Sequence, residues 1–137
     1  MNKIPYRYDI VGSFLRSERL KHARENFNNN LISKNELKKI ENEEILKLVK
    51  KEEAAGLKAV SDGEFRRSYW HLDFLAGLTG VKKIEAEKWS VDFKGVQPKA
   101  ATLKIIDKID FEDHEFLEHF EYLNSIIENG VTAKMTI

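Results

Sequence analysis

The sequence predicts an α/β fold built on a parallel sheet, and two observations lead to that prediction. A long amphipathic segment, residues 33–55, lies between short apolar segments at residues 8–11 and 57–61. A second amphipathic segment then precedes a third apolar segment at residues 131–137. Strands that alternate with helices are the pattern of parallel α/β proteins, so we expect these apolar segments to form parallel strands.

The clearest helix is predicted over residues 33–55. Ser33 and Glu36 have the capping-box spacing, in which each side chain accepts a free backbone N–H of the first turn. Gly56 stands where a helix commonly ends, because glycine readily adopts the left-handed conformation found there. One apolar stripe at helical spacing supports the helix: Leu37, Ile40, Ile45, Leu48 and Val49.

Shorter signals place the remaining elements of the pattern. Residues 8–11 are expected to form a buried strand, after which Gly12 allows the chain to turn. Ser17 can cap a helix that runs to about Phe27, and Asp113 can cap a later helix. The apolar face of that later helix consists of Phe116, Leu117, Phe120, Leu123, Ile126 and Ile127.

Between these helices the pattern changes from helical to extended. Residues 80–110 alternate short apolar runs with turn residues, among them Gly95 and Pro98. The strand candidates are residues 81–84, 89–93 and 101–105. We therefore expect an antiparallel β-rich insertion before the parallel pattern resumes.

Composition limits the classes of function. Lys and Arg total 23 and Asp and Glu also total 23, so the formal net charge is zero. Unbalanced positive charge is what mainly binds nucleic acids and acidic membranes, so we expect neither partner. The chain contains no cysteine, which excludes disulfides, thiolate nucleophiles and cysteine zinc ligands within it. With no apolar run near the ~20 residues of a membrane span, we expect a cytoplasmic protein.

The segment Asp-Gly-Glu-Phe-Arg-Arg at residues 62–67 carries the strongest chemical signal. It places two carboxylates and two guanidiniums at the carboxyl end of a predicted strand, where α/β folds bind ligands. A carboxylate there can hold a substrate ammonium group, and an arginine fork can hold a carboxylate. The combination suits an amino-acid substrate, and a surface ion-pair cluster is the alternative interpretation.

Two weaker candidates lie outside that segment. Gly12 and Ser13 offer backbone N–H groups and a hydroxyl after a strand, which can bind a carboxylate or simply form a turn. His71 lies among aromatic residues and can contact substrate, or can be a structural histidine bonded to Asp73 or to backbone. No set of side chains in the sequence matches the four ligands that zinc usually takes.

These segments resemble the cobalamin-independent methionine synthase family. The resemblance rests on Val-Gly-Ser-Phe-Leu-Arg at residues 11–16 and on Val-Ser-Asp-Gly-Glu-Phe-Arg-Arg at residues 60–67. Residues 70–74 and 133–137 are similar to the short, single-barrel branch of that family. The resemblance extends over the whole chain, but over only about the first third of a family barrel.

The resemblance implies the fold of a (β/α)₈ barrel, of which this chain would be an incomplete, N-terminal part. On that basis residues 8–79 would form the first two β/α units. Residues 80–110 would be the β-rich insertion, and residues 111–137 would supply a helix and the third strand.

The resemblance also implies a chemistry, which is methyl transfer from a methyl-folate to the thiol of homocysteine, activated by zinc. Gly12 and Ser13 would bind the carboxylate of the amino acid, and Glu64 would bind its ammonium group. Asp62, Arg66 and His71 are further candidates for substrate binding. The family's zinc ligands come from later strands and are absent from this chain, so we expect the isolated chain to be inactive.

Two alternatives remain open at the level of sequence. The acceptor can be another thiol that a related alkyl- or methyltransferase of the same superfamily uses. The chain can also be a non-catalytic α/β domain that self-associates through its unfinished sheet, because unpaired strand edges invite pairing.

Overall fold

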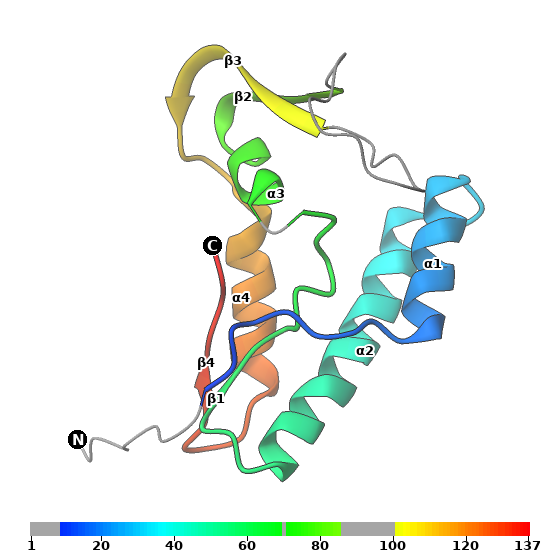
Figure 1. The fold of residues 1–137 in the computed structure, drawn as a ribbon, viewed down its shortest axis with the longest axis vertical. Coiled ribbons are helices and arrows are strands. Elements are labelled where there is room, and N and C mark those ends of the chain that lie inside the picture. Colours follow the sequence, from blue (N-terminus) through cyan, green and yellow to red (C-terminus); the bar gives the residue numbers. More distant parts are fainter. Residues whose placement is uncertain (1–8, 70, 86–100) are drawn as a thin grey trace, which may run out of the picture. The chain divides into compact units, whose positions relative to one another are not determined.

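The computed structural model describes residues 9–69, 71–85 and 101–137 and shows a mixed α/β chain (Figure 1). Its elements in chain order are α1 (Glu18–Asn28), α2 (Lys34–Ala54), β1 (Ala59–Val60), α3 (Leu72–Ala76), β2 (Thr79–Glu85), β3 (Ala101–Asp110), α4 (Glu115–Ile126) and β4 (Thr132–Ala133). The chain divides into two compact units. The first unit comprises the residues up to Arg67 together with 118–136, and the second comprises 68–117 and Ile137. No helix of the described residues is long and apolar enough to cross a membrane.

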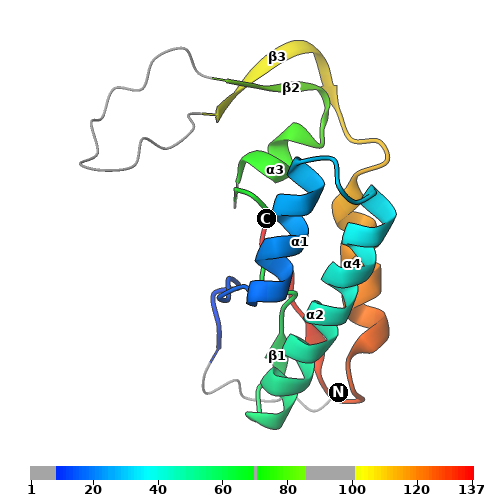
Figure 2. The same cartoon turned by 90° about the vertical axis from the view of Figure 1, so that its right-hand side faces the viewer.

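Helices α1 and α2 of the first unit begin at the predicted caps. Ser17 accepts the backbone N–H of Leu20 at 3.2 Å, and Ser33 forms the full capping box with Glu36. The helix predicted over residues 33–55 is confirmed, since α2 extends from Lys34 to Ala54. Figure 2 shows α1 and α2 packed side by side and running in opposite directions.

The first unit contains a two-stranded parallel sheet in which β1 pairs with β4. The N–H of Thr132 donates to the Lys58 carbonyl oxygen at 2.9 Å, and the N–H of Lys134 donates to that of Val60 at 2.8 Å. The prediction that the second and third apolar segments form parallel strands is confirmed. The regular strands are only two residues long each, shorter than the segments 57–61 and 131–137.

A small apolar core holds the helices against this sheet. Its buried members come from α1, α2, β1, the turn after β1 and α4, and they are Leu20, Ile45, Val49, Val60, Phe65 and Leu123. Burying apolar surface of this kind contributes on the order of 2 kcal/mol for each large aliphatic side chain. The core therefore fixes the end of β1 relative to α1, α2 and α4.

The strand predicted at residues 8–11 is wrong for the described part of that segment, residues 9–11. Val11 is 88% exposed, and these residues form no strand ladder. Side-chain contacts hold the segment instead, because the Lys134 ammonium donates to the Ile10 carbonyl oxygen and lies 2.7 Å from Asp9 Oδ2. The backbone of the chain bonds the turn after β1 at Phe14, whose N–H donates to the Gly63 carbonyl oxygen at 3.1 Å.

The second unit contains the antiparallel pair β2 and β3, which confirms the predicted antiparallel excursion over its described strands. Val81 lies opposite Ile105 and Glu85 lies opposite Ala101. The strand predicted at residues 89–93, with Gly95 and Pro98 after it, lies outside the described residues. Helix α3 was not predicted, because its five residues are too few to show helical periodicity.

Helix α4 is capped by His114, which corrects the prediction of Asp113 as the cap. The N–H of Phe116 donates to Nδ1 of His114 at 3.1 Å, and Nε2 lies 2.8 Å from the Phe74 carbonyl oxygen. Both contacts are satisfied when the neutral ring carries its hydrogen on Nε2. The ring is 4% exposed and packs on Phe74, Phe111 and Phe116. Asp113 itself is exposed.

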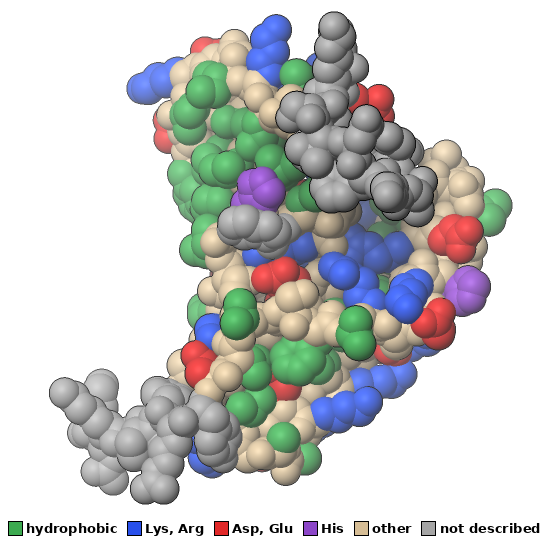
Figure 3. All heavy atoms as spheres, viewed as in Figure 1, with side chains coloured by type: hydrophobic (Ala, Val, Ile, Leu, Met, Phe, Trp, Pro, Cys, Tyr) green, Lys and Arg blue, Asp and Glu red, His purple; other side chains and the backbone are tan. Residues whose placement is uncertain are grey.

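Several apolar side chains of the second unit remain exposed. Figure 3 shows hydrophobic side chains gathered on one face of this unit. The exposed members on and after β3 are Ile105, Ile106, Ile109 and Phe111. The apolar face predicted for α4 is only partly covered, since Leu117 is 54% exposed while Leu123 is fully buried.

Glu52 is a buried carboxylate near the end of α2 in the first unit. It is 3% exposed, and both of its oxygens lie 3.3 Å from the backbone nitrogen of Ser61, the residue directly after β1. Burial raises the pKa of Glu52 to about 7, and the nearby Asp62 carboxylate acts in the same direction. The bond from the Ser61 N–H opposes this rise in pKa without cancelling it.

We expect Glu52→Gln to change how the stability of the chain depends on pH. The unfolded carboxyl loses its proton near pH 4.5, whereas the folded one keeps it until about pH 7. The stability of the wild type should therefore fall between those two values, by up to about 3 kcal/mol, and then level off. Urea unfolding at pH 4, 5.5 and 8 should show this fall for the wild type and not for Glu52→Gln.

The matched control for this measurement is Glu25→Gln, which changes an exposed glutamate on α1. It should keep the wild-type dependence on pH. If the free energy of unfolding depended on pH equally in Glu52→Gln and wild type, Glu52 would ionise as freely in the folded chain as in water.

We expect His114→Ala to lower the free energy of unfolding by about 1–3 kcal/mol, because it removes a helix cap and the buried ring that bonds the Phe74 carbonyl oxygen. His114→Asn should recover part of the loss, since asparagine also accepts the backbone N–H at a cap. Chemical denaturation measures both. The exposed His22→Ala is the control, and an alanine variant at position 114 as stable as that control would contradict the assignment.

Candidate functional site

The turn that follows β1, residues 63–66, contains a glutamate whose backbone is strained. We call it the Glu64 turn. Gly63 and Glu64 both have positive φ angles, of 67° and 55°. For glutamate this left-handed conformation costs about 1–2 kcal/mol. The Asp62 carboxylate, itself 3% exposed, stabilises the turn by accepting the N–H of Glu64 at 3.0 Å. Strain of this kind in a non-glycine residue is typical of functional sites.

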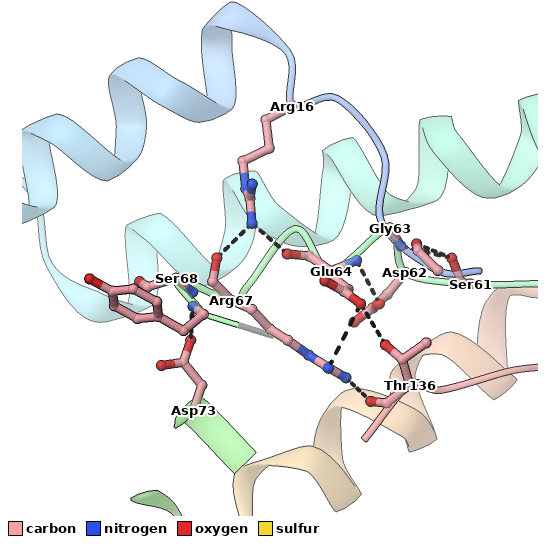
Figure 4. Close-up of polar contacts among 11 residues, drawn as sticks. Arg16, Ser61, Asp62, Gly63, Glu64, Arg67, Ser68, Asp73 and Thr136 are labelled. Atoms are coloured by element: carbon pink, nitrogen blue, oxygen red, sulfur yellow. Dashed lines mark hydrogen bonds and ion pairs between the residues drawn. The ribbon is translucent and has the colours of Figure 1, made fainter. Parts of the chain in front are cut away.

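The Glu64 side chain meets the segment that follows β4 (Figure 4). The Thr136 hydroxyl donates to Glu64 Oε1 at 2.8 Å, and Arg67 Nη1 lies 4.0 Å from the same oxygen. Arg67 also donates to the Thr136 carbonyl oxygen, and its side chain is 4% exposed. The carboxylate is therefore held in one orientation by groups from two segments.

Gly12 brings a third segment to this position. The Ser61 hydroxyl donates to the Gly12 carbonyl oxygen at 2.8 Å and accepts the N–H of Gly63 at 3.1 Å. A Cβ on Gly12 would lie 2.4 Å from Thr136 Cγ2 and 3.4 Å from Glu64 Oε1. Only glycine allows the backbone at position 12 to approach the Glu64 carboxylate and Thr136 this closely.

Three of the six predicted site residues, Gly12, Asp62 and Glu64, thus lie together in the first unit. Ser13 follows Gly12 directly, and its side chain is exposed. It is open to a ligand beside the Glu64 turn, and its predicted contact with a carboxylate stays a prediction.

Arg66 is directed away from Glu64 and toward α2. Its guanidinium lies 3.2 Å from Glu41 Oε2, bonds the Asn42 side chain and packs over the Tyr122 ring at 5.4 Å. The Arg66 side chain is 4% exposed, and its buried Nε has no hydrogen-bond partner among the described residues. We therefore assign Arg66 to the buried contact with α2 and do not count it among the proposed ligands.

His71 belongs to the second unit, where it is exposed and directly precedes α3. Its alternative interpretation, a structural histidine bonded to Asp73 or to backbone, also stays a prediction. Asp73 accepts the N–H groups of Ser68 and Tyr69 and pairs with Lys83 at 2.9 Å. A contact of His71 with substrate stays a prediction.

Sequence reasoning missed the residues that hold the Glu64 turn in place. They are Arg16, Arg24, Ser61, Arg67 and Thr136. The side chains of four of them donate to backbone carbonyl oxygens of distant segments. Such contacts leave no local pattern in the sequence. The one signal in the sequence was their position along the chain. Arg16 follows Gly12 within a few residues, and Thr136 follows β4.

No cluster of three or more His, Cys, Asp or Glu side chains that could hold a metal ion occurs in residues 9–69, 71–85 and 101–137. The arrangement can instead do what a fixed carboxylate beside exposed polar groups does, which is bind a cation such as an ammonium group.

Comparison with known proteins identifies the family. The family model described as the catalytic domain of cobalamin-independent synthase matches residues 8–133. The uncharacterized proteins YxjG and YxjH of Bacillus subtilis strain 168 are 44% identical over 135 residues and 43% identical over 136 residues. Each alignment covers 98% of this chain and 35% of the relative, so the chain spans about a third of the length of the curated relatives it matches.

A solved structure supports the same conclusion. The crystal structure of the "Putative Vitamin-B12 Independent Methionine Synthase" from Listeria monocytogenes superposes with a TM-score of 0.73 at 41% identity. The superposition covers 91% of this chain and 33% of that one. Because the family model spans nearly the whole chain, the chain belongs to the cobalamin-independent synthase family and matches its catalytic domain.

Proposed function

We propose that this chain supplies the amino-acid-binding turns of a methyltransferase that resembles the vitamin-B12-independent methionine synthases, with a homocysteine-like thiol as acceptor. The observation that carries the proposal is the Glu64 carboxylate, fixed by Thr136 and Arg67 beside Gly12. Membership of the cobalamin-independent synthase family supports methyl transfer in the parent protein.

In this proposal the two charged ends of the amino acid bind to two turns. The Glu64 carboxylate binds the ammonium group, because its orientation is set before the ligand arrives and little ordering entropy is lost. The exposed Ser13 hydroxyl and the backbone beside Gly12 bind the carboxylate. The Asp62 carboxylate stabilises the turn by accepting the backbone N–H of Glu64.

A (β/α)₈ barrel is the fold that we propose for the parent protein. The strands β1 and β4 are parallel neighbours. Glu64 follows β1 and Thr136 follows β4, so both lie beyond the carboxyl ends of their strands. In barrels of this class, active sites form at that end of the sheet.

Zinc does not fit the side chains that the described part of this chain provides. The chain has no cysteine, and its described side chains form no metal cluster. We therefore propose, from family membership, that zinc activation of the thiol and a methyl-folate donor belong to the parent protein. The isolated chain is proposed to bind the amino acid without turning it over.

The test of the proposal is amino-acid binding by Glu64 variants, measured by titration calorimetry with L-homocysteine and L-methionine. Glu64→Gln keeps the size of the side chain and removes its charge, so we expect affinity to fall at least about tenfold. A methionine analogue without the amino group should bind wild type and variant equally, since it has no ammonium group for Glu64 to bind.

Glu18→Gln is the control, because Glu18 is an exposed carboxylate in the first turn of α1. Equal loss of affinity for the analogue and for methionine would contradict ammonium binding by Glu64. The same titrations with thiols that lack the amino-acid group test the alternative acceptor, and tighter binding of such a thiol would favour another alkyltransferase of the superfamily.

Self-association is the second candidate role. Among the described residues β1 and β4 pair only with each other, and the nearby Val11 and Leu15 are 88% and 97% exposed. Unpaired edges and exposed apolar side chains favour pairing between copies. Light scattering over a hundredfold range of concentration (about micromolar upward) should show a dimer mass, and a constant monomer mass would exclude this role.

A further inference from the structure

Two arginines close the carbonyl side of the Glu64 turn. Arg16 Nη2 donates to the carbonyl oxygens of Glu64, at 2.8 Å, and of Arg67, at 2.6 Å (Figure 4). Arg24 donates through Nη1 to the carbonyl oxygens of Phe65 and Arg67, and through Nη2 to that of Arg66 at 2.9 Å. The four consecutive carbonyl groups of residues 64–67 are thus all bound by two guanidinium groups.

The turn needs such donors because of its own geometry. Residues 63–66 form a turn that is not continued as a helix, so its carbonyl groups lack the regular partners that a helix supplies. Among the described residues, one backbone bond closes on these four carbonyls, from the Arg67 N–H to the Glu64 oxygen at 3.1 Å. A guanidinium carries several donors in a rigid fork, and can therefore satisfy neighbouring carbonyls that a lysine could not reach together.

Helix α1 fixes where these two guanidiniums lie. Arg16 directly precedes the cap residue Ser17, and Arg24 lies one turn after Leu20, which is fully buried in the core. Arg19 on the same helix behaves differently. It pairs with Glu43 and Glu44 of α2 and is 47% exposed, so the contacts with the turn belong to particular positions and not to arginines of α1 in general.

We propose that Arg16 and Arg24 are positioning residues for substrate binding, which hold residues 64–67 so that the strained Glu64 presents its carboxylate to the amino group of the ligand. The identity of the ligand in this inference rests on the proposed function, whereas the role of the arginines in holding the turn rests on the contacts alone. Neither arginine needs to touch the substrate. The hydrogen bonds from the arginines offset the cost of the left-handed Glu64 backbone, which would otherwise relax.

The experiment compares Arg24→Met and Arg16→Met with the control Arg19→Met in the full 137-residue chain. Methionine keeps the apolar stem and removes every donor. Two readouts are needed: affinity for L-methionine by calorimetry, and the NMR coupling between the amide and α hydrogens of Glu64, which reports its φ angle. The amide signals of Thr132 and Lys134 verify that β4 still pairs with β1.

We expect Arg24→Met to shift the Glu64 coupling toward an averaged value and to weaken methionine binding about tenfold or more. Arg16→Met should act in the same direction, and Arg19→Met should change neither readout. Arg24→Lys should restore part of the affinity, because it keeps the charge and one donor but loses the fork.

The outcomes separate this inference from the proposed function. If wild type binds no amino acid while Arg24→Met still shifts the Glu64 coupling, the ligand proposal fails and the turn-holding role stands. If both arginine variants leave the Glu64 coupling and the affinity at wild-type values, the positioning role is overturned. Should Arg24→Met lose the β4 amide signals, Arg16→Met and Arg24→Lys decide the question by the same two readouts.

Discussion

Close packing at Gly12 is the constraint on which the candidate site depends. The backbone there lies against Thr136 and the Glu64 carboxylate, and the Ser61 hydroxyl bonds its carbonyl oxygen. A side chain at position 12 would separate the segments that follow β1 and β4. Once they are held together, the Thr136 hydroxyl and the Arg67 guanidinium can fix the orientation of Glu64. The absence of one Cβ thus sets the geometry of polar groups that come from three parts of the chain.

Buried acids on α2 distinguish this helix from an ordinary amphipathic one. Glu41, Glu44 and Glu52 are all buried, and each contacts a different partner. Glu41 pairs with Arg66 of the turn, Glu44 bonds the Ser17 cap and Arg19, and Glu52 accepts the N–H of Ser61. The Lys47 ammonium and the Ser17 hydroxyl lower the pKa of Glu44 to about 2, whereas burial raises that of Glu52. Helix α2 therefore orients α1 and the turn that contains Glu64 by polar contacts as well as by its apolar stripe.

Local sequence signals made the helices and the parallel strands predictable. The features that could not be predicted depend on long-range contacts. Ser17 and Ser33 cap their helices through atoms within three residues, so the pattern is complete in the sequence. The segment at residues 9–11 is apolar enough for a strand, but a strand needs a neighbour that no local pattern supplies. Asp113 has the stronger cap preference by residue type, yet His114 caps the helix because its ring also packs among three aromatic rings. Glu64 was predicted from its motif, while the opposite direction of Arg66 depends on Glu41, 25 positions away.

The contacts that hold Glu64 join residues far apart in sequence. Thr136 and Glu64 are separated by 72 positions, and Ser61 and Gly12 by 49. Loops of that length close late in folding, because their entropy must be lost before any contact compensates for it. The contacts of Glu64 cannot exist in a partly folded chain that has only its helices. A ligand bound there would favour the fully folded first unit over every earlier intermediate, so it would slow unfolding more than it would speed folding.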